Sequence, residues 1–227
     1  MILYKKKFFI ALLFIALIGI SSNVYATWIW STVKTDNWNS SMYGSITNDY
    51  NCDNFIFGTY GDPSAITWKI NADGDGCYIS SQIIYETENA GSSYGYLTPS
   101  SGDAYRAQVL LYLTGSIDHS SSGNPYSFLS IKVELYSGST VYGVVTQTYY
   151  DGTFTGNGIT LTTSSSTVGA SVRLHVRITM KLYGQGTSAE PSIVNDFLSS
   201  SNKIVLNSYY IQKEVWCSSG CPTTPSP

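Results

Sequence analysis

The sequence predicts an all-β fold, a single antiparallel β-sandwich that is jelly-roll-like, with about ten strands. Residues 171–182 alternate strictly between apolar and polar side chains, which gives a strand one dry and one wet face. Most of the remaining chain repeats this period with Ser, Thr and Tyr at the polar positions. Turn signatures such as Gly61-Asp62-Pro63-Ser64 recur at short intervals. Because no long helical crossover separates the strands, parallel βαβ units are excluded.

The strands expected from these patterns fill most of the chain after the N-terminal region. They are residues 27–35, 54–60, 65–70, 77–87, 92–98, 105–113, 129–135, 141–150, 158–162, 171–182 and 203–216. One exception is the segment from Glu190 to Ser200, where Ile193, Val194, Phe197 and Leu198 have helical spacing. The sequence therefore predicts at most one short helix.

The first 26 residues have the pattern of a secretory signal peptide. Lys5, Lys6 and Lys7 precede an apolar run that extends to Ile20, and Val24 and Ala26 form a small-residue cleavage pattern before Thr27. The alternative is an uncleaved anchor, but the apolar run of roughly 13 residues is short for a membrane span, which needs about 20. We therefore expect a secreted or cell-surface protein, attached to a membrane only if this segment is retained.

The charge balance excludes one class of partner and suggests others. Three of the 12 basic residues lie in the signal region and all 15 acidic residues lie beyond it, so the remainder has a formal charge of −6. This sign disfavours nonspecific binding of nucleic acid. Charged residues make up only 12% of the chain, so its surface must be rich in Ser, Thr, Asn, Gly and Tyr. Such a surface suits packing against copies of itself or binding of cell-surface sugars.

Four cysteines in an exported chain indicate two disulfide bonds. Three pairings are open, and we favour Cys52–Cys77, which would join two early strands, with Cys217–Cys221 closing a small C-terminal ring. The tail of residues 218–227 is small, polar and proline-bearing, and we expect it to be flexible.

The strand directly after the cleavage site has two interpretations. Residues 27–40 form either the first strand of the chain's own sandwich, residues 41–217, or an arm that completes the sheet of a neighbouring copy. The candidate assembly residues in this strand are Trp28, Ile29, Trp30 and Val33. Asn39-Ser40-Ser41 is an N-glycosylation sequon in the same stretch.

Residues 71–76, Asn-Ala-Asp-Gly-Asp-Gly, match the first half of an acidic calcium loop. Asn71, Asp73 and Asp75 would converge on one cation, and Cys77 could add its carbonyl oxygen. The match is incomplete, because the first position is Asn and Gln82 stands where a calcium loop has its bidentate Glu. The alternative is an ordinary Gly/Asp turn, so calcium is the one cofactor that the sequence suggests.

A basic stripe stands on the polar face of the 171–182 strand, formed by Arg173, His175, Arg177 and Lys181. As a binding site it could hold an anionic glycan, a lipid head group or a partner's carboxylates. As structure it is a solvated strand face, with cross-strand pairing to acids such as Glu134 or Glu214. The structural interpretation is favoured.

The chain has few of the groups that catalysis needs. His119 and His175 are its two histidines, and no nucleophile elbow, zinc-protease motif or phosphate loop is present. Paired carboxylates could serve a glycosidase, but no strand carries two acids on one face. We expect a protein that is not an enzyme.

In layout the chain resembles the subunits of secreted strand-exchange filaments, such as archaeal threads and related pili. These combine a signal peptide, a donated N-terminal strand (here residues 27–35) and a sandwich head rich in Ser, Thr and Tyr. This resemblance implies a non-catalytic structural protein that assembles by strand donation. The layout also resembles jelly-roll carbohydrate-binding modules, which implies the alternative function, a glycan- or surface-binding module with a structural calcium ion.

Overall fold

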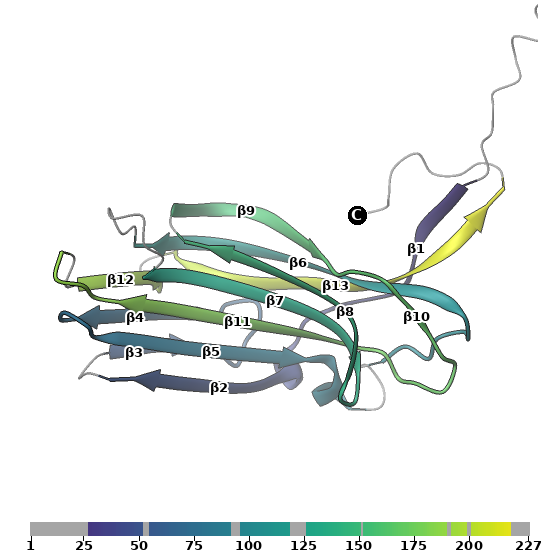
Figure 1. The fold of residues 1–227 in the computed structure, drawn as a ribbon, viewed down its shortest axis with the longest axis horizontal. Coiled ribbons are helices and arrows are strands. Elements are labelled where there is room, and N and C mark those ends of the chain that lie inside the picture. Colours follow the sequence, from purple (N-terminus) through teal and green to yellow (C-terminus); the bar gives the residue numbers. More distant parts are fainter. Residues whose placement is uncertain are drawn as a thin grey trace, which may run out of the picture. The chain divides into compact units, whose positions relative to one another are not determined.

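The computed structural model describes residues 27–51, 55–91, 96–118, 126–150, 152–189, 192–198 and 201–218. These residues form thirteen β-strands and two short 3-10 turns, Ser40–Met42 (η1) and Thr87–Ala90 (η2), and the described ranges contain no α-helix. The strands build two antiparallel sheets that face each other (Figure 1). The predicted all-β sandwich is confirmed, with thirteen strands in place of about ten.

The smaller sheet has five strands, and the strand richest in basic residues lies at its centre. Its order is β2 (Tyr43–Tyr50), β5 (Tyr78–Glu86), β11 (His175–Gln185), β7 (Ser127–Ser137) and β8 (Thr140–Tyr149). Every neighbouring pair is antiparallel.

The larger sheet has eight strands. Its main path runs β1 (Thr27–Asn37), β13 (Lys203–Cys217), β6 (Asp103–Ile117), β12 (Ser192–Phe197), β4 (Thr67–Asp73) and β3 (Phe55–Thr59). Two further strands, β9 (Gly152–Thr162) and β10 (Ser166–Val168), pair with β6.

The core lies between the sheets and is made by alternate residues of each strand. On β11 the inward side chains Ile178, Met180 and Leu182 are fully buried, and on β6 so are Leu111 and Leu113. This is the period-2 pattern that the sequence shows for both strands. Burial of this apolar surface is the main force that holds the two sheets together.

The helical spacing within residues 190–200 does not produce a helix in the described part of that segment, because residues 192–197 form strand β12, which pairs with β4. Ile193 and Phe197 are buried, and the residue midway between them, Asn195, is buried as well. A polar side chain at the middle inward position hides the period-2 pattern. The spacing of Ile193 and Phe197 then matches a helix and a strand equally well.

Asn195 is buried because it connects the two sheets through hydrogen bonds. Its Nδ2 donates to the Tyr183 carbonyl at 2.7 Å, and its Oδ1 accepts from the Ser127 hydroxyl at 2.7 Å and from the Asp118 backbone N–H at 2.9 Å. Tyr183 and Ser127 belong to the five-stranded sheet and Asn195 to the larger one. All polar atoms of the Asn195 side chain thus have partners, as a buried amide requires.

The described residues form two compact units, a large one of residues 32–213 and a small terminal one that joins residues 27–31 with residues 214–218. The predicted division into residues 27–40 and 41–217 stays a prediction. In the terminal unit the Trp28 and Trp216 rings meet edge to face, with centroids 5.2 Å apart, and are 60% and 54% exposed.

The predicted signal peptide, residues 1–26, lies outside the described residues, and so does the predicted tail beyond Ser218. Within the described ranges, no helix is long and apolar enough to cross a membrane.

Candidate ligand-binding face

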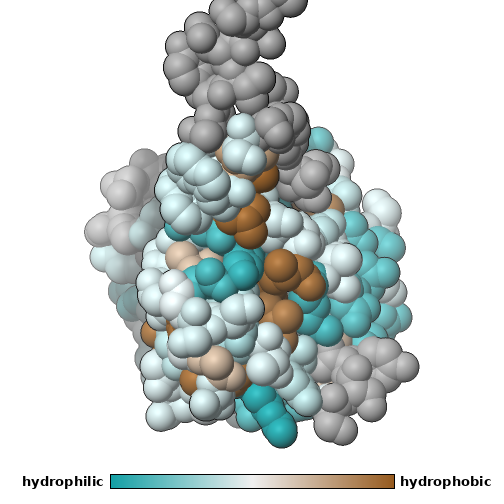
Figure 2. All heavy atoms as spheres, turned by 90° about the vertical axis from the view of Figure 1, so that its right-hand side faces the viewer, coloured by the Kyte–Doolittle hydropathy of each residue, from teal (hydrophilic) through white to brown (hydrophobic). Residues whose placement is uncertain are grey.

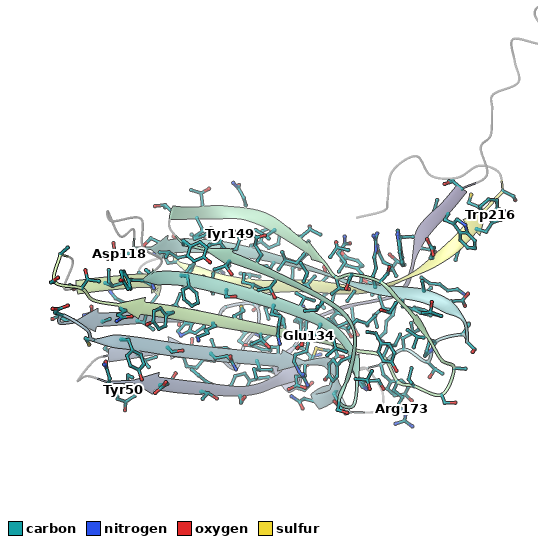
Figure 3. The ribbon with its side chains drawn as sticks, in the orientation of Figure 1. Tyr50, Asp118, Glu134, Tyr149, Arg173 and Trp216 are labelled. Atoms are coloured by element: carbon teal, nitrogen blue, oxygen red, sulfur yellow. The ribbon has the colours of Figure 1, made fainter. Side chains whose placement is uncertain are left out.

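The outer face of the five-stranded sheet is the candidate site. It consists of the side chains that point away from the core on four neighbouring strands. These are Gln82, Ile84 and Glu86 on β5; Arg177, Thr179, Lys181 and Tyr183 on β11; Phe128, Ser130, Lys132 and Glu134 on β7; and Thr146 and Thr148 on β8. The register aligns them in rows across the strands, such as Gln82, Lys181, Ser130 and Thr148. Figure 3 labels Glu134 among the strands of this sheet.

A hollow of about 470 Å³ lies on this outer face. Its lining contains one apolar side chain, Ile84, among hydrogen-bonding ones: Gln82, Glu86, Ser130, Lys132, Glu134, Thr146, Arg177, Thr179 and Lys181. The volume falls within the range of about 300–1,000 Å³ that is usual for ligand sites. The hollow is therefore large enough for a small polar ligand.

An ion-pair network borders the hollow on one side. Arg177 Nη2 lies 3.0 Å from Glu86 Oε2, and Arg177 Nη1 lies 3.6 Å from Glu134 Oε2. Lys132 Nζ lies 3.0 Å from Glu134 Oε1. Burial lowers the pKa of the Arg177 guanidinium, but the hydrogen bond and charge of Glu86, with the charge of Glu134, raise that pKa overall. The network holds these four side chains together on a partly buried surface.

Tyr136 extends this network toward the end of β7. Its hydroxyl lies 2.9 Å from Glu86 Oε2 and 3.1 Å from Glu88 Oε2, and the Arg177 guanidinium lies over its ring at 4.2 Å. Burial, followed by the hydrogen bond to Glu86 and the charges of Glu86 and Glu88, raises the pKa of the Tyr136 hydroxyl well above its usual value. Tyr136 therefore donates its hydrogen bond as a neutral phenol.

An aromatic row borders the hollow on the opposite side. The Phe128 and Tyr183 rings stack across β7 and β11 with centroids 5.1 Å apart, and Tyr78 stacks on Tyr183 at 6.4 Å. Tyr150, which is 53% exposed, meets Phe128 edge to face at 6.2 Å. The row offers apolar ring edges next to a polar floor.

The basic stripe predicted from the sequence is not continuous. Arg177 and Lys181 lie on the outer face, while Arg173 precedes β11 and lies with its guanidinium 4.8 Å from the centre of the Tyr96 ring. Leu174, the next residue, forms an isolated antiparallel bridge with Leu97 outside the named strands. Figure 3 shows Arg173 well apart from Glu134. The predicted pairing of the stripe with Glu134 is present at Arg177.

His175 differs from its prediction as a wet-face residue, because it is only 7% exposed. Its ring packs between Tyr136 and Tyr96, with centroids 5.7 and 6.0 Å away. Together with Arg173 and Glu88 it lines a second hollow of about 430 Å³ at the end of the sheet. The aromatic neighbours that bury His175 come from distant segments, so the alternation along residues 171–182 does not reveal them.

The predicted calcium loop is divided between a strand and a turn. Asn71 and Asp73 belong to β4, whereas Asp75 lies in the turn that leads to the other sheet, with Gly74 and Gly76 at φ values of 122° and 73°. The Cys77 carbonyl, a predicted ligand, accepts a hydrogen bond from the Gly186 N–H at 2.8 Å. Among the described residues, no three His, Cys, Asp or Glu side chains cluster as a metal site would need. Calcium binding stays a prediction, and melting temperatures with and without millimolar calcium test it.

Other predicted sites are only partly described. Cys77 and Cys217 are both disulfide-bonded, but Cys52 and Cys221 lie outside the described residues, so the predicted pairing stays a prediction. Asn39 is exposed and caps the 3-10 turn η1, with its Oδ1 accepting from the Ser41 N–H at 3.0 Å. Glycosylation at this position is not tested.

The predicted assembly strand is β1, and it pairs with β13 of the same chain. In the single chain, β1 therefore lies in its own larger sheet. Trp28, Ile29, Trp30 and Val33 all lie on β1. Donation of β1 to a neighbouring copy would require it to leave β13, and the observed pairing does not support such an exchange.

Sequence reasoning missed Glu86, Tyr136 and the hydrogen-bonding floor of the hollow. Glu86 shares the polar positions of β5 with Gln82, so its side of the strand could have been inferred from alternation. Its position beside Arg177, which lies 91 positions further along the chain, depends on the register of β5 against β11. No local pattern encodes that register.

No model of a known protein family matches the sequence, and no curated protein matches it. Solved structures that are similar include bacteriophage CBA120 tailspike protein 4, at 7% identity and a TM-score of 0.28, with 74% of this chain and 20% of the tailspike covered. A carbohydrate-binding module of the β-sandwich superfamily is 10% identical, with a TM-score of 0.29 and coverage of 76% and 56%. The module from Cellvibrio mixtus lichenase 5A in complex with cellotriose is 12% identical, with a TM-score of 0.28 and coverage of 73% and 98%. The chain thus spans about a fifth of the length of the tailspike structure and just over half of the length of the superfamily module structure. Identities and TM-scores this low carry no argument about ligand or activity.

Proposed function

We propose that the protein is an exported, non-catalytic glycan-binding module and that the outer face of its five-stranded sheet is the binding surface. The observation that carries this proposal is the hollow of about 470 Å³, whose lining is hydrogen-bonding at every position except Ile84. Sugars present many hydroxyl groups in a small volume, and each hydroxyl both donates and accepts hydrogen bonds. A densely polar hollow beside aromatic side chains matches that chemistry.

The hollow offers sugar hydroxyls both donors and acceptors at fixed positions. Glu86 and Glu134 accept, Lys132 and Arg177 donate, and the Ser130 and Thr179 hydroxyls do either. The ion pairs among Arg177, Glu86 and Glu134 hold the charged groups in place before a ligand arrives. Preorganised groups lose little conformational freedom on binding, which favours affinity. Phe128 and Tyr183 add apolar contact for the C–H groups of a sugar ring.

The arrangement of the two carboxylates favours binding over hydrolysis. Glu86 and Glu134 come from different strands and lie on the same outer face, a pairing that the sequence does not reveal. Both carboxylates contact one guanidinium, that of Arg177, which lies between them. A glycosidase needs one carboxylic acid and one carboxylate that flank the scissile bond with space between them. Here Arg177 occupies that space.

A glycan array followed by calorimetric titration of the best ligands tests the proposal on the full secreted chain. Thr179→Tyr places a large side chain in the hollow on a strand that tolerates aromatic residues, and it should abolish binding. Thr160→Tyr makes the same change at an exposed position of β9, in the other sheet, and should bind like the unaltered protein. The proposal is wrong if no glycan binds the unaltered protein, or if Thr179→Tyr binds as well as Thr160→Tyr.

A further inference from the structure

The charges on the outer face do not balance. Three cations, Lys132, Arg177 and Lys181, line the hollow with only two carboxylates, Glu86 and Glu134. Both carboxylates are engaged, Glu86 by Arg177 and Glu134 by Arg177 and Lys132. Among the residues that the structure describes, Lys181 makes no ion pair. The hollow therefore has a surplus positive charge, although the whole chain has a net charge of −3.

Lys181 lies on the side of the hollow away from the ion-pair network. Its Nζ is 5.9 Å from the centre of the Tyr183 ring and 6.0 Å from that of Phe128, so the ammonium group extends toward the aromatic row. Lys132 extends the other way, to Glu134. The two lysines thus leave the floor between them open. The aromatic rings attract the Lys181 ammonium weakly, and they do not neutralise it.

Neutral hydrogen-bonding groups surround Lys181 on the floor of the hollow. Gln82 on β5 and Ser130 on β7 are its cross-strand partners, and Thr179 is the next outward residue on β11. Each of these side chains has an N–H or O–H donor. An anionic group at this point would meet one ammonium and several neutral donors, the combination that stabilises a carboxylate.

We infer that the outer face takes an acidic glycan, one with a uronic acid whose carboxylate lies against Lys181. This inference rests on the proposed function and adds the chemical class of the ligand. The glycan's hydroxyls bind the network side of the hollow, and its carboxylate supplies the negative charge that the described residues do not provide for Lys181. Lys181 is thus the residue that selects acidic sugars over neutral ones.

The test compares an oligogalacturonate with its methyl ester, which keeps the hydroxyl groups and removes the charge. Titrations use the full secreted chain, its Lys181→Gln variant and its Lys203→Gln variant. Lys203 is an exposed lysine at the start of β13 in the other sheet, so this variant loses the same charge outside the hollow. We expect the unaltered protein and Lys203→Gln to bind the acid about three- to tenfold more tightly than the ester, a preference that added salt reduces. Lys181→Gln should bind both forms equally.

The possible failures are distinguishable. Equal binding of acid and ester by the unaltered protein overturns the acidic class of ligand, and a preference that survives in Lys181→Gln overturns the placement of the carboxylate against Lys181. If the unaltered protein binds neutral glycans on the array but neither uronate probe, the acidic class is wrong and the proposed function stands. If no glycan of either kind binds, both proposals are overturned.

Discussion

The two faces of the five-stranded sheet have different roles: alternate residues of one strand point either into the core or into the polar hollow. On β11, Ile178, Met180 and Leu182 point inward and are fully buried, whereas Arg177, Thr179 and Lys181 point outward into a polar hollow. Inward residues contribute free energy of folding in proportion to the apolar surface they bury. Outward residues contribute little to folding and carry the groups that a ligand can contact. Stability and binding should therefore be separable by substitutions one residue apart.

The largest effect is expected on the inner face. Leu182→Ala removes a fully buried core side chain of β11, the strand between β5 and β7, and should lower the free energy of unfolding by about 2–5 kcal/mol. Urea unfolding followed by tryptophan fluorescence measures this. A loss comparable to that of an exposed substitution would contradict the position of Leu182 in the core.

Arg177 is the exception to the comparison, because it is an outer-face residue with a structural role. Arg177→Met leaves Glu86 without the ion pair that the structure gives it, while Glu134 keeps Lys132, and should cost about 1–3 kcal/mol in the free energy of unfolding. Arg177→Met combined with Glu86→Gln should recover part of that loss, since the neutral amide needs no counter-charge. If the double variant is less stable than Arg177→Met, the lost stability does not come from the unpaired charge.

Burial of Tyr136, which contacts Glu86 of the ion-pair network, makes the free energy of unfolding depend on pH in the alkaline range. The pKa of Tyr136 is raised above its usual value of 10.0, chiefly by burial, so above about pH 10 the unfolded chain releases this proton while the folded chain retains it. The free energy of unfolding should therefore fall as pH rises above about 10. Tyr136→Phe should reduce that fall by about 1 kcal/mol at about pH 11. Thermal melts from neutral pH to about pH 11 measure both slopes, and identical slopes would contradict the prediction.

The smallest effect on stability is expected from the proposed ligand contacts. Lys181→Gln should change the free energy of unfolding by less than about 0.5 kcal/mol, because Lys181 is partly exposed and makes no ion pair with a described residue. The same variant should lose its preference for an acidic glycan. Calorimetry and thermal melts on one protein sample give both values, and a large loss of stability would end the proposed separation of the two faces.

The sequence predicts the fold well because the fold follows from local alternation. The period-2 pattern of residues 171–182 places Ile178 inside and Arg177 outside, as the structure shows. The composition, with few charged residues, also predicts a surface of weakly polar residues, and the face in Figure 2 is mostly of intermediate hydropathy. The pattern fails at Asn195, where a buried polar residue interrupts it, and at Arg173, where the chain has not yet entered β11.

The candidate site was harder to predict, because it depends on register between strands that are distant in sequence. Arg177 could be paired with Glu134 as one of several acids, but Glu86 meets it only through the alignment of β5 with β11. Hydrogen-bonding residues such as Ser130 and Thr179 have no distinctive local pattern among many other Ser and Thr residues. Their convergence on one hollow appears only when four strands are placed side by side.

Mapping amide chemical-shift changes by NMR, with the best-bound glycan added, tests most directly whether the outer face is the binding surface. The account predicts that the largest changes cluster at Ser130, Thr179 and Lys181, whose positions on adjacent strands line the hollow. Changes confined to the residues around Arg173, or to the terminal unit with Trp28 and Trp216, would place the ligand elsewhere and contradict it.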